Sequence, residues 1–204
     1  MSSRTETTAV RSSFATPAAA WIPATGARRI AAGLALSAGF AALTVVGANI
    51  VIPLEPVPIT MQTLFVLLAG ASIGAGWGTV SQWMYVGLGA LGLPLFAGGA
   101  SGAGVLAGPT GGYLISFLVA PWVIGTMLRR SDRLGWQVLS FVTGKAVILA
   151  LGVAHLTLFY THDLGRAFAV GVVPFLPGAV FKVAAAVSIH RSSQALVRHY
   201  RARG

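Results

Sequence analysis

The chain has 204 residues, of which 55% are apolar and only 9% are charged. Soluble globular domains carry roughly 25% charged residues, so this composition and a mean hydropathy of +0.80 indicate one polytopic membrane domain. The sequence contains no cysteine, which excludes thiol chemistry and cysteine-based metal sites, and its four histidines show no metal-ligand spacing.

The amino-terminal segment, residues 1 to about 26, is rich in Ser, Thr and Ala and is predicted to be a disordered cytoplasmic tail. A signal peptide is the alternative, but Pro17 and Pro23 interrupt the stretch and no continuous apolar core precedes a cleavage site. The membrane domain is predicted at residues 27–199, followed by a short basic cytoplasmic tail at 200–204.

Several apolar segments are long enough to cross a bilayer. A spanning helix needs about 20 mostly apolar residues, and we predict an all-α integral membrane protein with six such helices. They are expected at roughly 28–51, 59–75, 77–93, 111–128, 135–158 and 177–197. The apolar segment 165–176 is shorter and contains Pro174, so we expect a loop or half-helix there, at the outer surface.

The basic residues predict the orientation of these helices. With the amino terminus in the cytoplasm, 11 of the 14 basic residues lie on the cytoplasmic side, before span one, after span four and after span six. Arg166 alone lies outside, while Lys145 and Lys182 fall within spans. The positive-inside rule therefore places both termini in the cytoplasm. The net charge of +10 is a topology signal, and nucleic acid is not an expected partner.

Small residues recur at four-residue intervals along the first predicted helix, and Ala31 and Ala35 belong to this stripe. Such a stripe lets another helix approach closely in lipid. The sequence leaves two interpretations open, which are packing within the bundle and docking of a partner membrane protein.

The second predicted helix begins with VPITMQTL, residues 57–64. Pro56 and Pro58 favour an extended backbone before it, and Thr60 and Gln62 place polar groups near the outer surface. Hydrogen bonds between helices would explain these polar residues, and so would contacts to a polar ligand.

A glycine-rich stretch from Pro94 to Leu114 separates two apolar segments and is not expected to form a regular helix. Irregular backbone near membrane depth occurs where it lines a cavity or is buried in protein. The stretch is therefore a candidate wall of a binding site, with Gly98 and Gly99 letting the backbone approach a ligand. A flexible outer loop without a binding role is the alternative.

Two lysines lie inside predicted spans, where ionisable residues are costly and usually functional. Lys182 is near the outer end of the last span, where it could snorkel to the interface or offer a cation to an anionic ligand. Lys145 is about ten residues into the fifth span. We expect it either to contact an internal carbonyl or hydroxyl group or to contact a ligand.

No aspartate or glutamate lies inside a predicted span, which disfavours a carrier driven by protons or sodium. A phosphate-binding loop is absent, because TGKA at 143–146 lacks the final Ser or Thr, so ATP hydrolysis by that route is excluded. No catalytic motif or pair of catalytic carboxylates is found, and the chain is not expected to be an enzyme.

Three segments together carry a family resemblance: VPITMQTLFVLLAGASIG at 57–74, GLPLFAGGASGAGVLAGPTGGYLISF at 92–117, and PFLPG at 174–178 with Lys182 shortly after it. The chain resembles the BioY family, the biotin-specific substrate-binding (S) components of energy-coupling-factor (ECF) transporters, over nearly everything from residue 30 to 190. The resemblance implies a six-helix bundle with both termini cytoplasmic. It also implies that biotin binds near the outer face.

The resemblance implies partners and site residues as well. A transmembrane coupling subunit would dock on the small-residue face at Ala31 and Ala35, and two ATPase subunits would supply the energy. The protein would be surrounded by lipids in the cell membrane and would need no cofactor, with biotin as its ligand. The residues expected to bind biotin are Lys182, Gly98, Gly99, Tyr113, Phe96, Gln62, Thr60 and Lys145, the two aromatic rings covering the apolar ring body.

Three positions depart from the family pattern. Ala179 stands where an aspartate is common, Lys145 where an asparagine is common, and His155 where a tryptophan is common. An aspartate would accept hydrogen bonds from the ureido N–H groups of biotin, and an alanine cannot. Two alternatives therefore stay open: an S component for a different small vitamin or carboxylate, and a structural membrane protein without a transport role.

Overall fold

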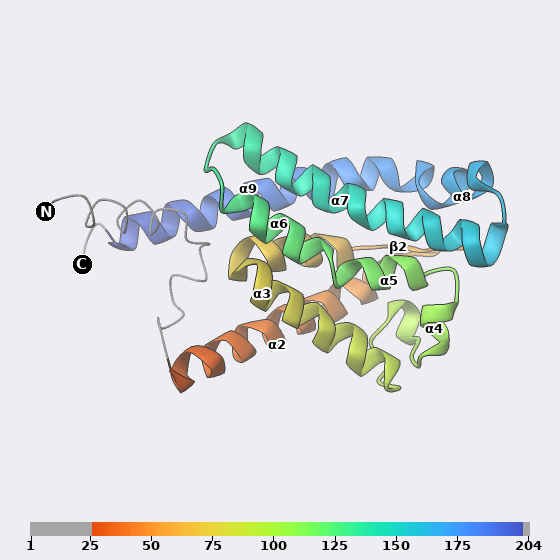
Figure 1. Cartoon of the computed structure of the whole chain (residues 1–204), viewed down its shortest axis with the longest axis horizontal. Coiled ribbons are helices and arrows are strands. Elements are labelled where there is room, and N and C mark those ends of the chain that lie inside the picture. Colours follow the sequence, from red (N-terminus) through yellow and green to blue (C-terminus); the bar gives the residue numbers. More distant parts are fainter. Residues whose placement is uncertain (1–25, 202–204) are drawn as a thin grey trace, which may run out of the picture.

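The computed structural model describes residues 26–201, which form a helical bundle with one short β-hairpin (Figure 1). The all-α class predicted from composition and hydropathy is confirmed for this part of the chain. The predicted amino-terminal tail lies outside the described residues except for Gly26, and so does the predicted basic tail from residue 202 onward.

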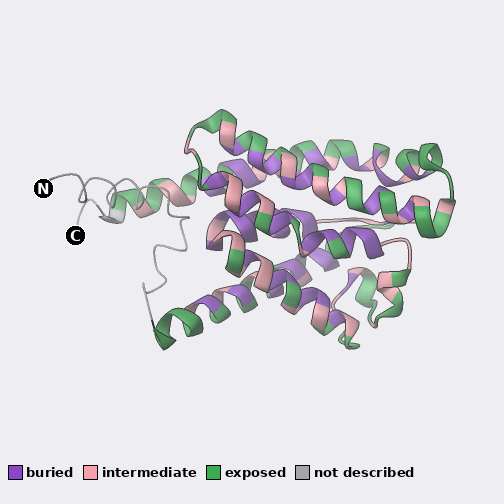
Figure 2. Ribbon diagram, viewed as in Figure 1, coloured by how far each residue is buried: buried purple, intermediate pink, exposed green. Residues whose placement is uncertain are grey.

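Helix α2 (Ala27–Asn49) packs along α3 through its smallest side chains. A Cβ atom added to Gly33 would lie 2.2 Å from the Trp77 ring, so this contact requires glycine. Ser37 Oγ donates a 2.9 Å hydrogen bond to the Trp77 carbonyl oxygen. Ala31 and Ala35 lie on a different face of the helix and are exposed. The bundle therefore packs against α2 without using the predicted small-residue stripe, and Figure 2 shows the exposed face that α2 retains.

A short β-hairpin joins α2 to α3. Strand β1 (Val51–Ile52) pairs antiparallel with strand β2 (Ile59–Thr60). As predicted, Pro58 leads into extended backbone. The pairing of this backbone with β1 is a finding of the structure, because the sequence analysis identified no signal for it.

The chain reverses inside α3 (Gln62–Ala90). Gly74 has a φ of 84°, in the left-handed region that favours glycine, and it interrupts the helical backbone. Gln62 Nε2 lies 3.0 Å from Tyr85 Oη, whereas 23 residues of straight helix would separate the two by about 34 Å. The two halves of α3 therefore run antiparallel, and the reversal falls close to the boundary predicted between spans two and three.

The glycine-rich stretch forms short turns instead of a long helix, as predicted. It contains the 3₁₀ turn η2 (Ala97–Gly99) and the short helix α4 (Gly104–Ala107). It then leads into α5 (Gly111–Phe117) and α6 (Ala120–Leu128). Pro121 lies in the first turn of α6 and has no N–H to continue the hydrogen bonding of α5, which explains the break between the two helices.

Two long helices and a short outer helix complete the chain. Helix α7 (Leu134–Leu156) continues through the π-helical turn η3 (Thr157–Thr161). Helix α8 (Leu164–Gly171) and the turn η4 (Val173–Phe175) follow. Of the two alternatives predicted for 165–176, a loop or a half-helix, the structure has a short helix followed by a turn. Helix α9 (Leu176–Arg201) ends the described chain.

By length and hydropathy, five segments of residues 26–201 could span a membrane. The predicted division of Gln62–Ala90 into two spans agrees with the reversal at Gly74. Each half is nevertheless shorter than the roughly 20 residues of a typical spanning helix, so the count of six remains a prediction. The five segments are Ala27–Asn49, Gln62–Ala90, Gly111–Leu128, Leu134–Thr161 and Leu164–His199.

The start of α2, the connection between α6 and α7, and the end of α9 lie at the same end of the bundle (Figure 1). We call this the inner end, and we call the opposite end, with α4 and α8, the outer end. The inner end carries the arginines predicted to be cytoplasmic, among them Arg28, Arg129 and Arg198.

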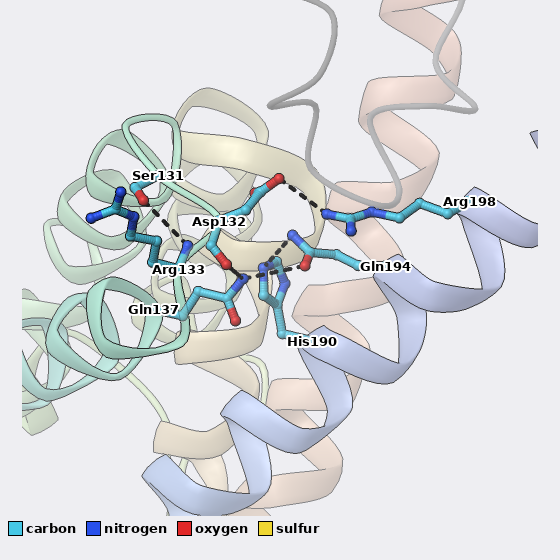
Figure 3. A network of polar contacts seen from close by, with 7 residues as sticks. All are labelled: Ser131, Asp132, Arg133, Gln137, His190, Gln194 and Arg198. Atoms are coloured by element: carbon cyan, nitrogen blue, oxygen red, sulfur yellow. Dashed lines mark hydrogen bonds and ion pairs between the residues drawn. The ribbon is translucent and has the colours of Figure 1, made fainter.

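A polar network joins the α6–α7 connection to α9 at the inner end (Figure 3). The carboxylate of Asp132 lies 3.0 Å from the guanidinium of Arg198. Gln137 Nε2 donates a 3.2 Å hydrogen bond to Gln194 Oε1, and Gln194 Nε2 lies 3.1 Å from His190 Nε2. These contacts hold the inner ends of α7 and α9 beside each other.

Candidate functional site: a cavity with two lysines

A cavity of about 240 Å³ lies in the outer half of the bundle. It brings together six of the eight predicted binding residues, and Thr60 and Lys182 among them are 122 positions apart in the sequence. The residues that line the cavity are Val57, Pro58, Thr60, Gln62, Thr63, Phe96, Ala97, Ala100, Val105, Thr110, Tyr113, Leu114, Phe117, Lys145, Leu149, Phe175 and Lys182.

Lys182 reaches the cavity from the first turns of α9. Its side chain is only 4% exposed, and Nζ donates a hydrogen bond to the carbonyl oxygen of Thr60 in β2. The ammonium group therefore points into the bundle and does not snorkel to the interface. The same contact ties α9 to the β-hairpin.

Lys145 reaches the cavity from the middle of α7. It is 5% exposed and makes no hydrogen bond or ion pair with any residue in 26–201. The internal carbonyl or hydroxyl partner that the sequence left open is therefore absent from the described chain. None of the acidic residues in the described part of the chain lines the cavity.

Polar groups at the start of α3 supply hydrogen-bond acceptors. Gln62 Nε2 donates to Tyr85 Oη, which fixes the amide plane and leaves Gln62 Oε1 free of side-chain partners within the described residues. Thr63 Oγ1 is buried and also lacks a described partner. A ligand in the cavity that carries N–H groups could donate to Gln62 Oε1, whereas Thr63 Oγ1 has almost no accessible surface.

Aromatic side chains form the apolar part of the wall. Phe96 is 2% exposed and meets Tyr85 edge to face, with ring centroids 5.7 Å apart. Tyr113 stacks on Phe175 with centroids 5.9 Å apart, and its Oη donates a 2.7 Å hydrogen bond to the Gly171 carbonyl oxygen. Such a wall suits the apolar body of a small ligand, whose orientation is then set by a few polar groups.

Gly98 and Gly99 do not line the cavity, unlike the other six predicted residues. Both have positive φ, 69° and 76°, and both are exposed. They make a tight turn in which the Phe96 amide donates to the Ala100 carbonyl oxygen at 3.1 Å. The glycines therefore shape a turn that presents Phe96 and Ala100 to the cavity, while the two glycines themselves are not part of its lining.

Two of the positions that depart from the family pattern lie beside the cavity. Ala179 lines a neighbouring apolar groove between α7 and α9, and this groove shares Lys145 with the cavity. His155 Nε2 lies 3.0 Å from the Gly108 carbonyl oxygen, so His155 supports the glycine-rich stretch without lining the cavity.

Several lining residues were not predicted from the sequence, including Phe117, Leu149 and Phe175. Leu149 is one helical turn from Lys145 and shares its face, which is a signal that was available. Phe117 and Phe175 lie in the motifs that carry the family resemblance. Within the described residues, no group of three or more His, Cys, Asp or Glu side chains could hold a metal ion.

The model of the BioY family matches residues 15–199, a range that includes every residue lining the cavity. The chain belongs to the BioY family. The biotin transporter BioY of Thermotoga maritima is 47% identical over 150 residues, which are 74% of this chain and 88% of the relative. The probable biotin transporter BioY of Pyrococcus horikoshii is 40% identical over 156 residues, 76% of this chain and 92% of the relative.

The BioY fold is also found among solved structures. The crystal structure of the S-component for biotin from an ECF-type ABC transporter matches with a TM-score of 0.77 and 28% sequence identity. The match covers 84% of this chain and 95% of the other. With its apolar helices, this BioY member is a multi-pass protein of the cell membrane, as predicted.

Proposed function

We propose that the chain captures biotin at the outer face of the cytoplasmic membrane, as the substrate-binding subunit of an ECF-type vitamin uptake transporter. The observation that carries the proposal is the cavity itself, which in a BioY member combines two buried lysines with an aromatic wall and a buried oxygen acceptor. The names of the relatives and the solved S-component support the same ligand.

The chemistry of the cavity matches the parts of biotin. The apolar bicyclic body fits the wall formed by Phe96 and Tyr113, and the ureido N–H groups find an acceptor in Gln62 Oε1. This oxygen takes over the accepting role that Ala179 cannot fill. The valerate carboxylate finds lysine ammonium groups. Biotin is bound and released without reaction, so we propose no catalytic residue and no cofactor.

The direct test is equilibrium binding of radiolabelled biotin to the purified protein in detergent. Saturable binding at one site per chain, with biotin raising the melting temperature, is the expected result. A thermal-shift screen with biotin, dethiobiotin and other vitamins separates biotin from a different vitamin or small carboxylate. A protein that retains no ligand from the screen would be a structural membrane protein, and the proposal would be wrong.

The proposal includes docking of a coupling subunit on α2, through Ala31 and Ala35. Both alanines are exposed, while Gly33 and Ser37 on another face of α2 pack against α3. Small side chains on a lipid-facing stripe let a second helix approach closely. The inner end carries the arginine-rich segments, so the ATPase subunits that energise uptake would act from that side.

Replacing both Ala31 and Ala35 by Leu tests the docking. The larger side chains would hold the partner helix away, so ATP-dependent biotin uptake should be abolished while binding to the purified subunit stays intact. Ala150 and Ala154 provide a matched control, because they are exposed, four residues apart and on α7. The same double substitution there should leave uptake unchanged. Normal uptake by the Ala31 and Ala35 variant would refute the docking role.

A further inference from the structure

The cavity contains one buried cation that the described chain leaves without a partner. Lys145 is 5% exposed, lines the cavity, and makes no hydrogen bond or ion pair within residues 26–201. Burial of an ammonium group without acceptors is unfavourable, because the charge loses its hydration and gains nothing in return. A negatively charged occupant of the cavity would remove this cost.

The second lysine increases the need for an anion. Lys182 is also buried in the cavity wall, and its carbonyl partner Thr60 solvates the ammonium group without neutralising it. The described acidic residues lie elsewhere: Glu55 is exposed, Asp132 pairs with an arginine at the inner end, and Asp163 caps α8. A volume of about 240 Å³ therefore holds two cations and no carboxylate from the described chain.

We propose that Lys145 receives the carboxylate of the ligand, with Lys182 beside it, and that this pair makes the cavity select anionic ligands over neutral ligands of the same shape. The inference rests on the proposed function, in which biotin is the ligand and its valerate carboxylate is the anion. Lys145 is better able than Lys182 to bind the carboxylate. None of the ammonium N–H groups of Lys145 donates to the described chain, whereas Lys182 already donates to Thr60.

Comparing two ligands distinguishes carboxylate binding by Lys145 from a general contribution of this residue to the site. Biotin amide keeps the ureido ring and the apolar body of biotin but replaces the carboxylate by a neutral group. Dissociation constants for both ligands are measured on the purified full chain and on Lys145→Met. The wild type should prefer biotin over the amide. In Lys145→Met, biotin should bind about 10- to 150-fold more weakly, the effect of losing one charge-assisted hydrogen bond, while binding of the amide changes little.

Two further variants complete the comparison. Lys145→Arg keeps the positive charge and should keep the preference for biotin over the amide. Leu139→Met is the control: Leu139 lies on the same helix as Lys145, is exposed, and lines neither the cavity nor the neighbouring groove, so this variant should leave both dissociation constants unchanged. Melting temperatures report whether each variant is folded, and Lys145→Gln takes the place of Lys145→Met if the latter does not fold.

The outcomes distinguish failure of the inference about Lys145 from failure of the proposed function. Equal weakening of biotin and its amide in Lys145→Met would assign Lys145 to the ureido oxygen or to packing, and the inference would be wrong. Unchanged binding of both ligands would also overturn it. In both cases the wild type still binds biotin, so the proposed function stands. If the wild type binds neither ligand, the proposed function itself fails, and the inference fails with it.

Discussion

Buried polar side chains occur at both ends of the bundle, but the two ends differ in how far the described chain supplies hydrogen-bond partners for them. At the inner end, Gln137, Gln194 and His190 contact one another and join α7 to α9. In the outer cavity, Lys145 and Thr63 Oγ1 have no hydrogen-bond partner in the described chain. The inner groups are paired where α7 and α9 pack together, whereas Lys145 lines an open cavity.

The comparison distinguishes polar groups that stabilise the fold from groups that are available to a ligand. It is a difference of degree, because Gln137 Oε1 and His190 Nδ1 also lack a described partner. Each of those side chains nevertheless makes at least one hydrogen bond to the chain. Substitutions in the cavity should therefore change ligand affinity most, and substitutions at the inner end should change stability alone.

After Lys145→Met, the largest effect is expected for Lys182→Met, which removes the second cavity cation while preserving length and apolar character. Loss of a charge-assisted hydrogen bond costs about 1.5–3 kcal/mol, so the dissociation constant for biotin should rise about 10- to 150-fold. Equilibrium binding of radiolabelled biotin measures this. Ile189→Met is a control on the same helix, because Ile189 is exposed and outside the cavity. If Lys182→Met binds biotin as tightly as the parent, the role of Lys182 is only to hold α9 to Thr60.

A smaller effect is expected for Gly99→Val in the turn that presents Phe96 to the cavity. Gly99 has a φ of 76°, and a β-branched residue in this region adds strain of about 1–2 kcal/mol. If the turn relaxes, biotin affinity should fall roughly 5- to 30-fold, with only a small loss in melting temperature. Gly104→Ala is the control, since Gly104 is helical with open space for a Cβ atom. Comparable losses of stability and affinity would mean that the turn serves folding.

Tyr113→Phe should have a weaker effect, because it keeps the aromatic ring and removes only the hydroxyl that donates to the Gly171 carbonyl oxygen. A neutral hydrogen bond contributes about 1 kcal/mol, so the melting temperature should fall slightly and biotin affinity should change about fivefold or less. Tyr160→Phe is the control, because Tyr160 is exposed at the outer end. A loss of affinity far above this range would place the hydroxyl itself in contact with biotin.

The smallest effect is expected at the inner end. Asp132→Asn removes the ion pair with Arg198, whose side chain is 68% exposed, and exposed pairs contribute at most about 1 kcal/mol. Thermal denaturation should show a small loss of stability that high salt largely hides, and biotin affinity should stay unchanged. A tenfold change in affinity would contradict the comparison, because it would couple the two ends of the bundle.

Much of this arrangement could be predicted from the sequence, because its strongest signals are local. Hydropathy indicates the long helices, and the arginine clusters predict that the start of α2, the α6–α7 connection and the end of α9 share one side. The glycines from 98 to 112 predict irregular backbone. The motif residues Gln62, Phe96 and Tyr113 could be assigned to the site because they lie in segments of recognisable family pattern.

The remaining features depend on packing between distant segments. The sequence could not show which face of α2 meets α3, because alanine and glycine stripes suit both a neighbour and a partner. It could not show that Gly98 and Gly99 shape a turn behind the cavity wall, since a glycine's φ is set by its surroundings. Nor could it show that Lys145 lacks a partner while Lys182 finds one in Thr60, since those contacts join residues far apart in the chain.

The hydrogen bond between Lys182 and Thr60 also bears on when, during its synthesis, the protein first becomes able to bind its ligand. The cavity wall begins at Val57 and ends at Lys182 in α9, so its two margins are synthesised far apart in time. A nascent chain with α2 to α7 already in the bilayer would still lack one cation and the tie to the β-hairpin. Domains are generally synthesised and folded from the amino terminus, so ligand capture should appear only once α9 is inserted. Biotin retention is thus a readout of the membrane integration of α9.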